Sequence, residues 1–143
     1  MFDIHHNFIV KAPASAVFEA FCTPEGLDSW WTLKSAGEPV LDCLYTFYFG
    51  PEYDWRAKVT QVVEGRNLTW YMVKTMDDWQ GTTVGFELSE KGYATHVHFF
   101  HLGWREANEH FGVTTYCWGQ LLNGLKKYVE EGIIIPHARR NAS

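Results

Sequence analysis

The sequence predicts an α+β fold in which a curved antiparallel sheet of six strands wraps around a long C-terminal helix. Six segments alternate apolar and polar residues, which is typical of strands with one buried face. Residues 106–131 instead repeat apolar residues at helical spacing, and a helix of that length extends about 39 Å. A long helix with one apolar face must bury that face, and the remainder of the chain offers a sheet. At 143 residues the chain fits one domain, so residues 1–143 are interpreted as a single domain.

The first strand and two short helices precede the rest of the sheet. Residues 2–11 alternate, with Ile4 and Phe8 on the same face. Pro13 stands at the expected start of a first short helix, where a missing backbone N–H costs little. A second short helix is expected over residues 24–31. Residues 34–39 are expected to form a loop.

Five further alternating segments follow and are separated by turn residues. These segments are residues 40–49, 55–64, 68–74, 82–88 and 94–102. Consecutive short strands joined by tight turns form antiparallel sheets. We therefore expect neighbouring segments to pair in chain order, with their inward side chains facing the C-terminal helix.

The C-terminal helix carries one apolar stripe. The stripe consists of Phe111, Thr115, Trp118, Leu122, Leu125 and Val129. Gly132 follows the last periodic residue, where a left-handed cap is favourable. Trp118 is near the middle of the stripe and is expected to anchor the helix and to form part of a cavity wall. On that expectation Trp118→Ala costs about 1–3 kcal/mol, less than the loss of a fully packed tryptophan.

Composition limits the function classes. Aromatic residues make up 17% of the chain, a proportion that favours a bulky core or a pocket walled by rings. The net charge of −5 argues against nucleic acid as a partner. No apolar run is long enough to span a membrane, and no secretory signal is visible, so we expect a cytoplasmic protein. The three cysteines are odd in number and far apart, as is typical of free thiols.

Several motifs, taken in order, resemble a known superfamily. They are Ala12-Pro13, Val17-Phe18, Thr23-Pro24-Glu25, Trp30-Trp31, His101-Leu102-Gly103-Trp104 and the run from Trp118 to Gly132. The order of elements resembles the helix-grip fold of the START and birch-pollen-allergen superfamily, also known as SRPBCC. Within it, the motifs are similar to the bacterial family named after the activator of the heat-shock-protein-90 ATPase. Where members often carry a Gly-Gly pair opening the second strand, this chain has Cys43-Leu44.

The resemblance implies a hydrophobic cavity between the sheet and the C-terminal helix. Inward-facing residues then become candidate ligand contacts. The candidates are Trp31, Tyr45, Phe47, Val59, Trp70, Met72, Val84, Phe86, Phe99, His101, Phe111, Thr115, Trp118 and Leu122. The first hypothesis is a non-catalytic binder of a small hydrophobic or aromatic molecule, without a cofactor, that exists as a monomer or weak homodimer.

Two other functions remain open from the sequence. Family members include cyclases, and an enzyme of the cyclase or aromatase kind would use His101 and Tyr45 for proton transfer. His101 shares parity with Val97 and Phe99, so its ring is expected to point inward. The third hypothesis is a protein-interaction module that acts on a chaperone or a stress-related partner.

Histidines and acidic pairs give weaker signals. His96 and His98 share a strand face and form a possible metal pair, but their parity predicts that they face solvent without a third ligand. Asp77 and Asp78 are adjacent, so their side chains diverge, and a solvated turn is the preferred interpretation. We therefore expect no metal site.

Overall fold

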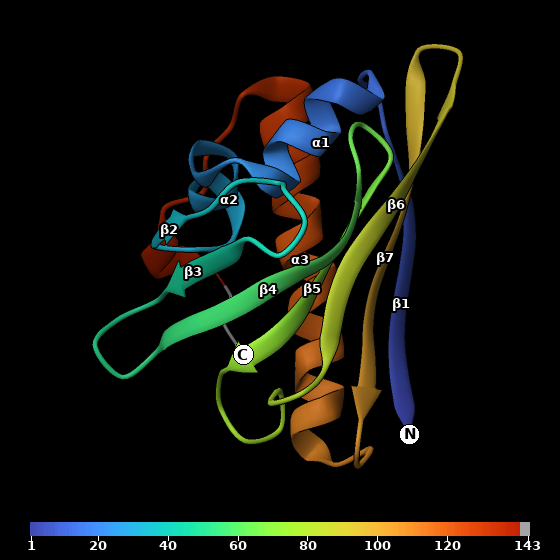
Figure 1. The fold of residues 1–143 in the computed structure, drawn as a ribbon. Coiled ribbons are helices and arrows are strands. Elements are labelled where there is room, and N and C mark those ends of the chain that lie inside the picture. Colours follow the sequence, from blue (N-terminus) through green and yellow to red (C-terminus); the bar gives the residue numbers. More distant parts are fainter. Residues whose placement is uncertain (141–143) are drawn as a thin grey trace.

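The computed structural model describes residues 1–140 and contains one antiparallel sheet (Figure 1). Seven strands follow the order β1-β7-β6-β5-β4-β3-β2, and every neighbouring pair is antiparallel. The strands are β1 (Phe2–Val10), β2 (Lys34–Ala36), β3 (Leu44–Tyr48), β4 (Asp54–Val63), β5 (Asn67–Lys74), β6 (Thr83–Lys91) and β7 (Ala94–Trp104). The α+β prediction is confirmed, and β1 forms one edge of the open sheet, beside β7.

The expected number of six strands is wrong, because residues 34–36 form β2 rather than a loop. Lys34 pairs with Tyr48 and Ala36 pairs with Thr46, so β2 extends the sheet beyond β3. Three residues are too few to show an alternating pattern. The pairing with β3, which lies at a distance in the sequence, creates this strand.

The long helix α3 (Glu109–Glu131) crosses the concave side of the sheet, as Figure 1 shows. It begins three residues later than expected, because the side chain of Asn108 caps it by accepting a hydrogen bond from the Phe111 N–H. It ends at Gly132, whose φ of 70° gives the expected left-handed cap. The described part of the chain contains no helix that is long and apolar enough to cross a membrane.

Two short helices cover one end of the sheet beside α3 (Figure 1). They are α1 (Ala14–Cys22) and α2 (Pro24–Trp30). Thr23 caps α2 by accepting a hydrogen bond from the Gly26 N–H. A Cβ at Gly26 would lie 2.6 Å from the backbone of Ala20, so glycine permits the close approach of α1 and α2. The end of α2 thereby fixes where the Trp30-Trp31 pair enters the core.

The core lies between the concave sheet face and the three helices. Inward side chains alternate along the strands as predicted; on β4, Trp55, Ala57 and Val59 are all buried. Aromatic rings fill much of this space and contact each other directly, as Phe21 does with Phe86 at 4.0 Å between centroids. The aromatic excess of the sequence therefore forms mainly a packed interior.

Candidate functional site

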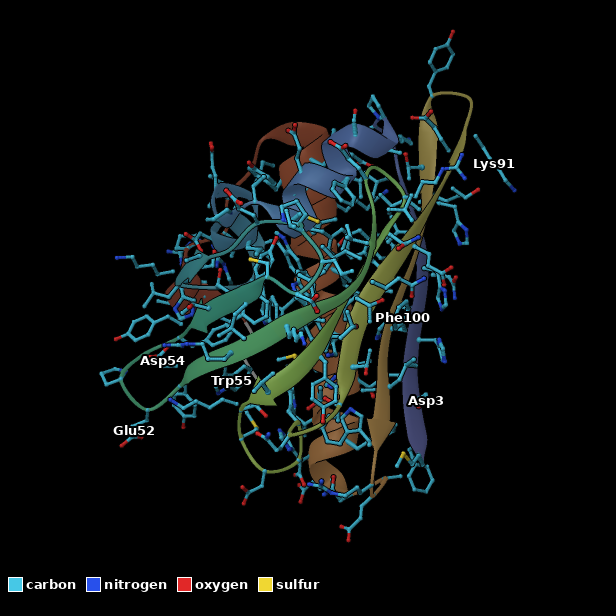
Figure 2. The ribbon with its side chains drawn as sticks, in the orientation of Figure 1. Asp3, Glu52, Asp54, Trp55, Lys91 and Phe100 are labelled. Atoms are coloured by element: carbon cyan, nitrogen blue, oxygen red, sulfur yellow. The ribbon has the colours of Figure 1, made fainter. Side chains whose placement is uncertain are left out.

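A pocket of about 560 Å³ opens at one end of this core, and we refer to it as the aromatic pocket. Its walls come from the residue after α2, the β3–β4 hairpin, the β5–β6 loop, α3 and the C-terminal segment. The lining residues are Trp31, Phe49, Tyr53, Trp55, Met76, Trp79, His110, Leu121 and His137. Figure 2 shows Trp55 near the base of the β3–β4 hairpin, and Glu52 lies at its tip.

Packed rings hold the walls of the aromatic pocket. Trp55 contacts Phe49 and Trp79, each at 4.9 Å between ring centroids. Trp31 and Trp79 both pack against Trp118, at 5.1 and 5.6 Å. Because these four tryptophans and Phe49 support one another from separate elements, the pocket is formed before any ligand enters.

The structure places only one of the predicted ligand contacts, Trp31, on this pocket. Most of the others are buried side chains of the packed core, without an opening to the pocket. These core residues are Tyr45, Phe47, Val59, Trp70, Met72, Val84, Phe86, Phe99, His101, Trp118 and Leu122. Phe111 and Thr115 are half-buried on α3. The sequence therefore predicted correctly that these side chains face the interior. A side chain that faces the interior does not for that reason line an open pocket.

Trp118 packs behind the pocket wall. Its side chain is 1% exposed and contacts Trp31, Trp79 and Phe99. Its indole N–H also donates to Nδ1 of His101 at 3.1 Å. Trp118 has the surroundings of a fully packed core residue. The smaller loss of stability that the sequence led us to expect for Trp118→Ala is therefore not supported.

His101 is a core histidine whose two ring nitrogens are both occupied. Because the Trp118 indole can only donate, Nδ1 of His101 accepts. Nε2 lies 2.8 Å from Oγ1 of Thr82, and the Thr82 hydroxyl donates to the carbonyl of Trp79 at 2.6 Å. Nε2 therefore carries the proton and donates. Burial, with a smaller contribution from the charge of His110, lowers the pKa of His101 to about 3.

Tyr45, the other candidate for proton transfer, is also engaged in the core. Its hydroxyl donates to the Cys22 carbonyl at 2.7 Å, and burial raises the pKa of this phenol. Three strands, β4, β5 and β6, separate β3 from β7, so Tyr45 and His101 do not share a site. This geometry does not favour the proton-transfer pair that the enzyme hypothesis requires.

A carboxylate–histidine pair that the sequence did not reveal is found beside the aromatic pocket. Nδ1 of His110 lies 2.8 Å from Oδ2 of Asp78, which comes from the β5–β6 loop. The hydrogen bond from His110 is the main cause of the lowered pKa of Asp78. The two residues are 32 positions apart, so no local spacing indicated them. Asp78 is thus more than part of the solvated turn that the sequence predicted.

The C-terminal segment completes the pocket with His137, in the short 3-10 helix η1 (His137–Arg139). Arg140 fixes this segment by donating to the carbonyls of Asp28, Thr32 and Ile135 at 2.8, 3.1 and 2.8 Å. Burial lowers the pKa of His137. The segment therefore adds a second imidazole to an otherwise largely apolar lining.

On the outer sheet face, His98 interacts with residues of the two neighbouring strands. Nε2 of His98 lies 2.9 Å from Nδ1 of His5 on β1, and Nδ1 of His98 lies 3.2 Å from Glu87. His98 thus interacts across strands rather than with His96. Within residues 1–140 no three His, Cys, Asp or Glu side chains are grouped so that they could hold a metal ion.

Fold and pocket together define a helix-grip protein with an aromatic pocket at one end of the grip. The family described as Activator of Hsp90 ATPase homolog 1-like protein matches residues 11–130. The chain belongs to this family, as the motifs of the sequence had indicated. A comparison with curated proteins gives no match.

Solved structures share the fold over nearly the full chain. The Aha1 dimer from Colwellia psychrerythraea is 28% identical, with a TM-score of 0.83 over 92% of this chain and 98% of that chain. SSP2350 from Staphylococcus saprophyticus is 20% identical, with a TM-score of 0.79 over 94% and 96%. CalU16 from Micromonospora echinospora is 18% identical, with a TM-score of 0.75 over 97% and 80%.

Proposed function

We propose that this protein binds a small apolar, aromatic molecule in the aromatic pocket. The observation that carries the proposal is a preformed hollow of about 560 Å³ in which most lining side chains are aromatic. Pockets that take small organic ligands usually have volumes of about 300–1,000 Å³ and apolar walls with a few polar groups. His110 and His137 provide such polar groups here.

The proposed site differs in position from the cavity that the sequence led us to expect. The expected ligand contacts along α3 are packed against the sheet, whereas the hollow lies between the β3–β4 hairpin, the β5–β6 loop and the C-terminal segment. A ligand in the pocket would stack on Trp31 or Trp55, and Trp118 would support the pocket wall from behind. Binding alone is the function best supported, because His101 and Tyr45 are both hydrogen-bonded in the core.

A neutral fluorescent probe, N-phenyl-1-naphthylamine, tests this proposal. We expect saturable binding with an increase in probe emission, together with a rise in thermal stability. At a hundredfold excess over the dissociation constant, the stabilisation should reach about 2.7 kcal/mol. Mass spectrometry of the natively purified protein would then identify what it carries from the cell.

Two variants locate the probe. Met76→Trp enlarges a half-buried pocket residue and should weaken binding by filling the hollow. Tyr93→Ala is the matched control, because Tyr93 is 99% exposed in the β6–β7 turn. Figure 2 shows that neighbouring Lys91 lies at the far end of the sheet from Trp55. If the probe does not bind, or if both variants bind it as the parent does, the proposed function is wrong.

A protein-interaction role is the second candidate, because the description of the family refers to an activator of the Hsp90 ATPase. In that case a chaperone should bind this protein with equal affinity before and after Met76→Trp. Retention of a single chaperone in a pull-down, without any probe binding, would favour this candidate.

A further inference from the structure

We propose that the aromatic pocket selects ligands that carry a hydroxyl donor, such as a phenol or an enol, and that Nε2 of His110 accepts this proton in a hydrogen bond. Asp78 is the positioning residue that orients the imidazole. This inference rests on the proposed function, since it specifies the chemistry of the molecule that the pocket takes.

The hydrogen bond between His110 and Asp78 fixes which imidazole nitrogen faces a ligand. A carboxylate can only accept, so Nδ1 of His110, 2.8 Å from Oδ2 of Asp78, must carry a proton. In the neutral ring, the lone pair is then on Nε2. No residue of the described chain makes a hydrogen bond to Nε2, and His110 lines the pocket. The pocket therefore contains an oriented acceptor without a partner.

Three neighbouring residues support this arrangement. Asn108 lies at the N-terminus of α3, and its side-chain amide nitrogen is 3.5 Å from Oδ2 of Asp78. Arg105 donates to the carbonyl of Asp77 at 2.7 Å, and its charge also lowers the pKa of Asp78. The Trp104 ring packs edge-on against the imidazole of His110 at 5.4 Å. Because both partners of the pair are supported, the acceptor keeps one orientation.

The other pocket residues indicate that the ligand is neutral. None of the nine lining residues is Lys, Arg, Asp or Glu, so the lining itself offers no fixed charge to a ligand. His137, the second imidazole, has no carboxylate partner among residues 1–140 that would fix its tautomer. His101 contrasts with His110, because both of its nitrogens are already used in the core. His110 is therefore a lining group whose acceptor nitrogen is fixed by a hydrogen bond, and it can discriminate between ligands of equal shape.

Three naphthalenes that differ in one substituent test the proposal at about pH 8, where an ordinary imidazole is neutral. They are 2-naphthol, 2-methoxynaphthalene and 2-naphthoate, and quenching of tryptophan emission reports their affinities. We expect 2-naphthol to bind about threefold to tenfold more tightly than its methyl ether, the effect of one net hydrogen bond. The ether keeps the ring but cannot donate.

Three variants assign the preference to the pair. His110→Phe keeps an aromatic ring beside Trp104 and should bind both neutral naphthalenes equally. Asp78→Asn can donate to Nδ1, which moves the imidazole proton to Nε2, so the preference should shrink or reverse. Tyr93→Ala, altered outside the pocket, is the control and should keep it. Unfolding temperatures of all three identify any variant that fails to fold.

Several results would overturn the proposal. Equal binding of naphthol and ether by the parent protein would leave the aromatic pocket as a binder but remove the hydroxyl selectivity. An unchanged preference in His110→Phe would place the acceptor elsewhere. If naphthoate binds most tightly and loses that affinity in His110→Phe, the imidazole acts as a cation. If neither neutral naphthalene binds, the proposed function fails as well.

Discussion

The packed interior around His101 and the aromatic pocket around His110 share one wall, formed by Trp79. The Trp79 ring contacts His101 at 4.6 Å and also lines the pocket. On the interior side the histidine is fully buried and both of its nitrogens are hydrogen-bonded. On the pocket side only one nitrogen is bonded, and 27% of the side chain is exposed. Two histidines of one chain therefore have different environments, which differ in burial and in the number of hydrogen-bonded ring nitrogens.

Trp118→Ala should give the largest effect, because Trp118 belongs to the packed interior. Removing a fully packed tryptophan costs about 3–5 kcal/mol, and Nδ1 of His101 also loses its donor. Urea unfolding measures the loss. Val113→Ala is the control on the same helix, where the side chain is 46% exposed and should change stability by well under 1 kcal/mol. A loss of only about 1 kcal/mol for Trp118→Ala would instead place this residue on an open cavity.

The pH dependence of stability should show the burial of His101. Its pKa is about 3 in the folded protein, below the ordinary value of 6.5, so between these values the unfolded chain binds more protons. The contribution of this group to the free energy of unfolding is therefore fully present above about pH 6.5 and is lost as the pH falls. At pH 5 the loss from this one group should be about 2 kcal/mol.

His101→Gln isolates that contribution. Glutamine can accept from Trp118 and donate to Thr82 but does not titrate near neutral pH, so the stability should vary less between pH 7 and 5. Urea unfolding at both pH values gives the comparison. Identical slopes in the two proteins would show that other groups cause the acid sensitivity.

Trp55→Ala should change stability less than Trp118→Ala does, but it should give the largest change in ligand binding. Trp55 faces the pocket and contacts only Phe49 and Trp79 among the rings, so its loss should cost about 1–3 kcal/mol. The affinity of Trp55→Ala for N-phenyl-1-naphthylamine should fall. Leu125→Ala is the control, because Leu125 is a core residue outside the pocket, and the folded variant should keep the parent's affinity. Equal affinities would exclude Trp55 from the binding surface.

Much of the fold was visible in the sequence because strand and helix periods are local properties. Alternation predicted that Trp55, Ala57 and Val59 face inward, and the helical stripe predicted the burial of Trp118 and Leu122. Gly132 marked the end of α3. The strand expected at residues 40–49 begins only at Leu44, because Asp42 turns the chain with a φ of 68°. The sequence did not predict the strand β2, because its three residues form a strand only by pairing with β3.

The sequence by itself determined the family, the α+β architecture and the inward parity of His101. Only the tertiary structure decided where the interior remains open, because the pocket forms where five separate segments fail to close completely. It also decided the roles of the histidines. Burial keeps His101 neutral, and its hydrogen bonds to Trp118 and Thr82 fix its tautomer. His110 is oriented because a distant loop brings Asp78 within 2.8 Å. Periodicity encodes which face of a segment is buried, whereas contacts between distant segments depend on how the whole chain packs.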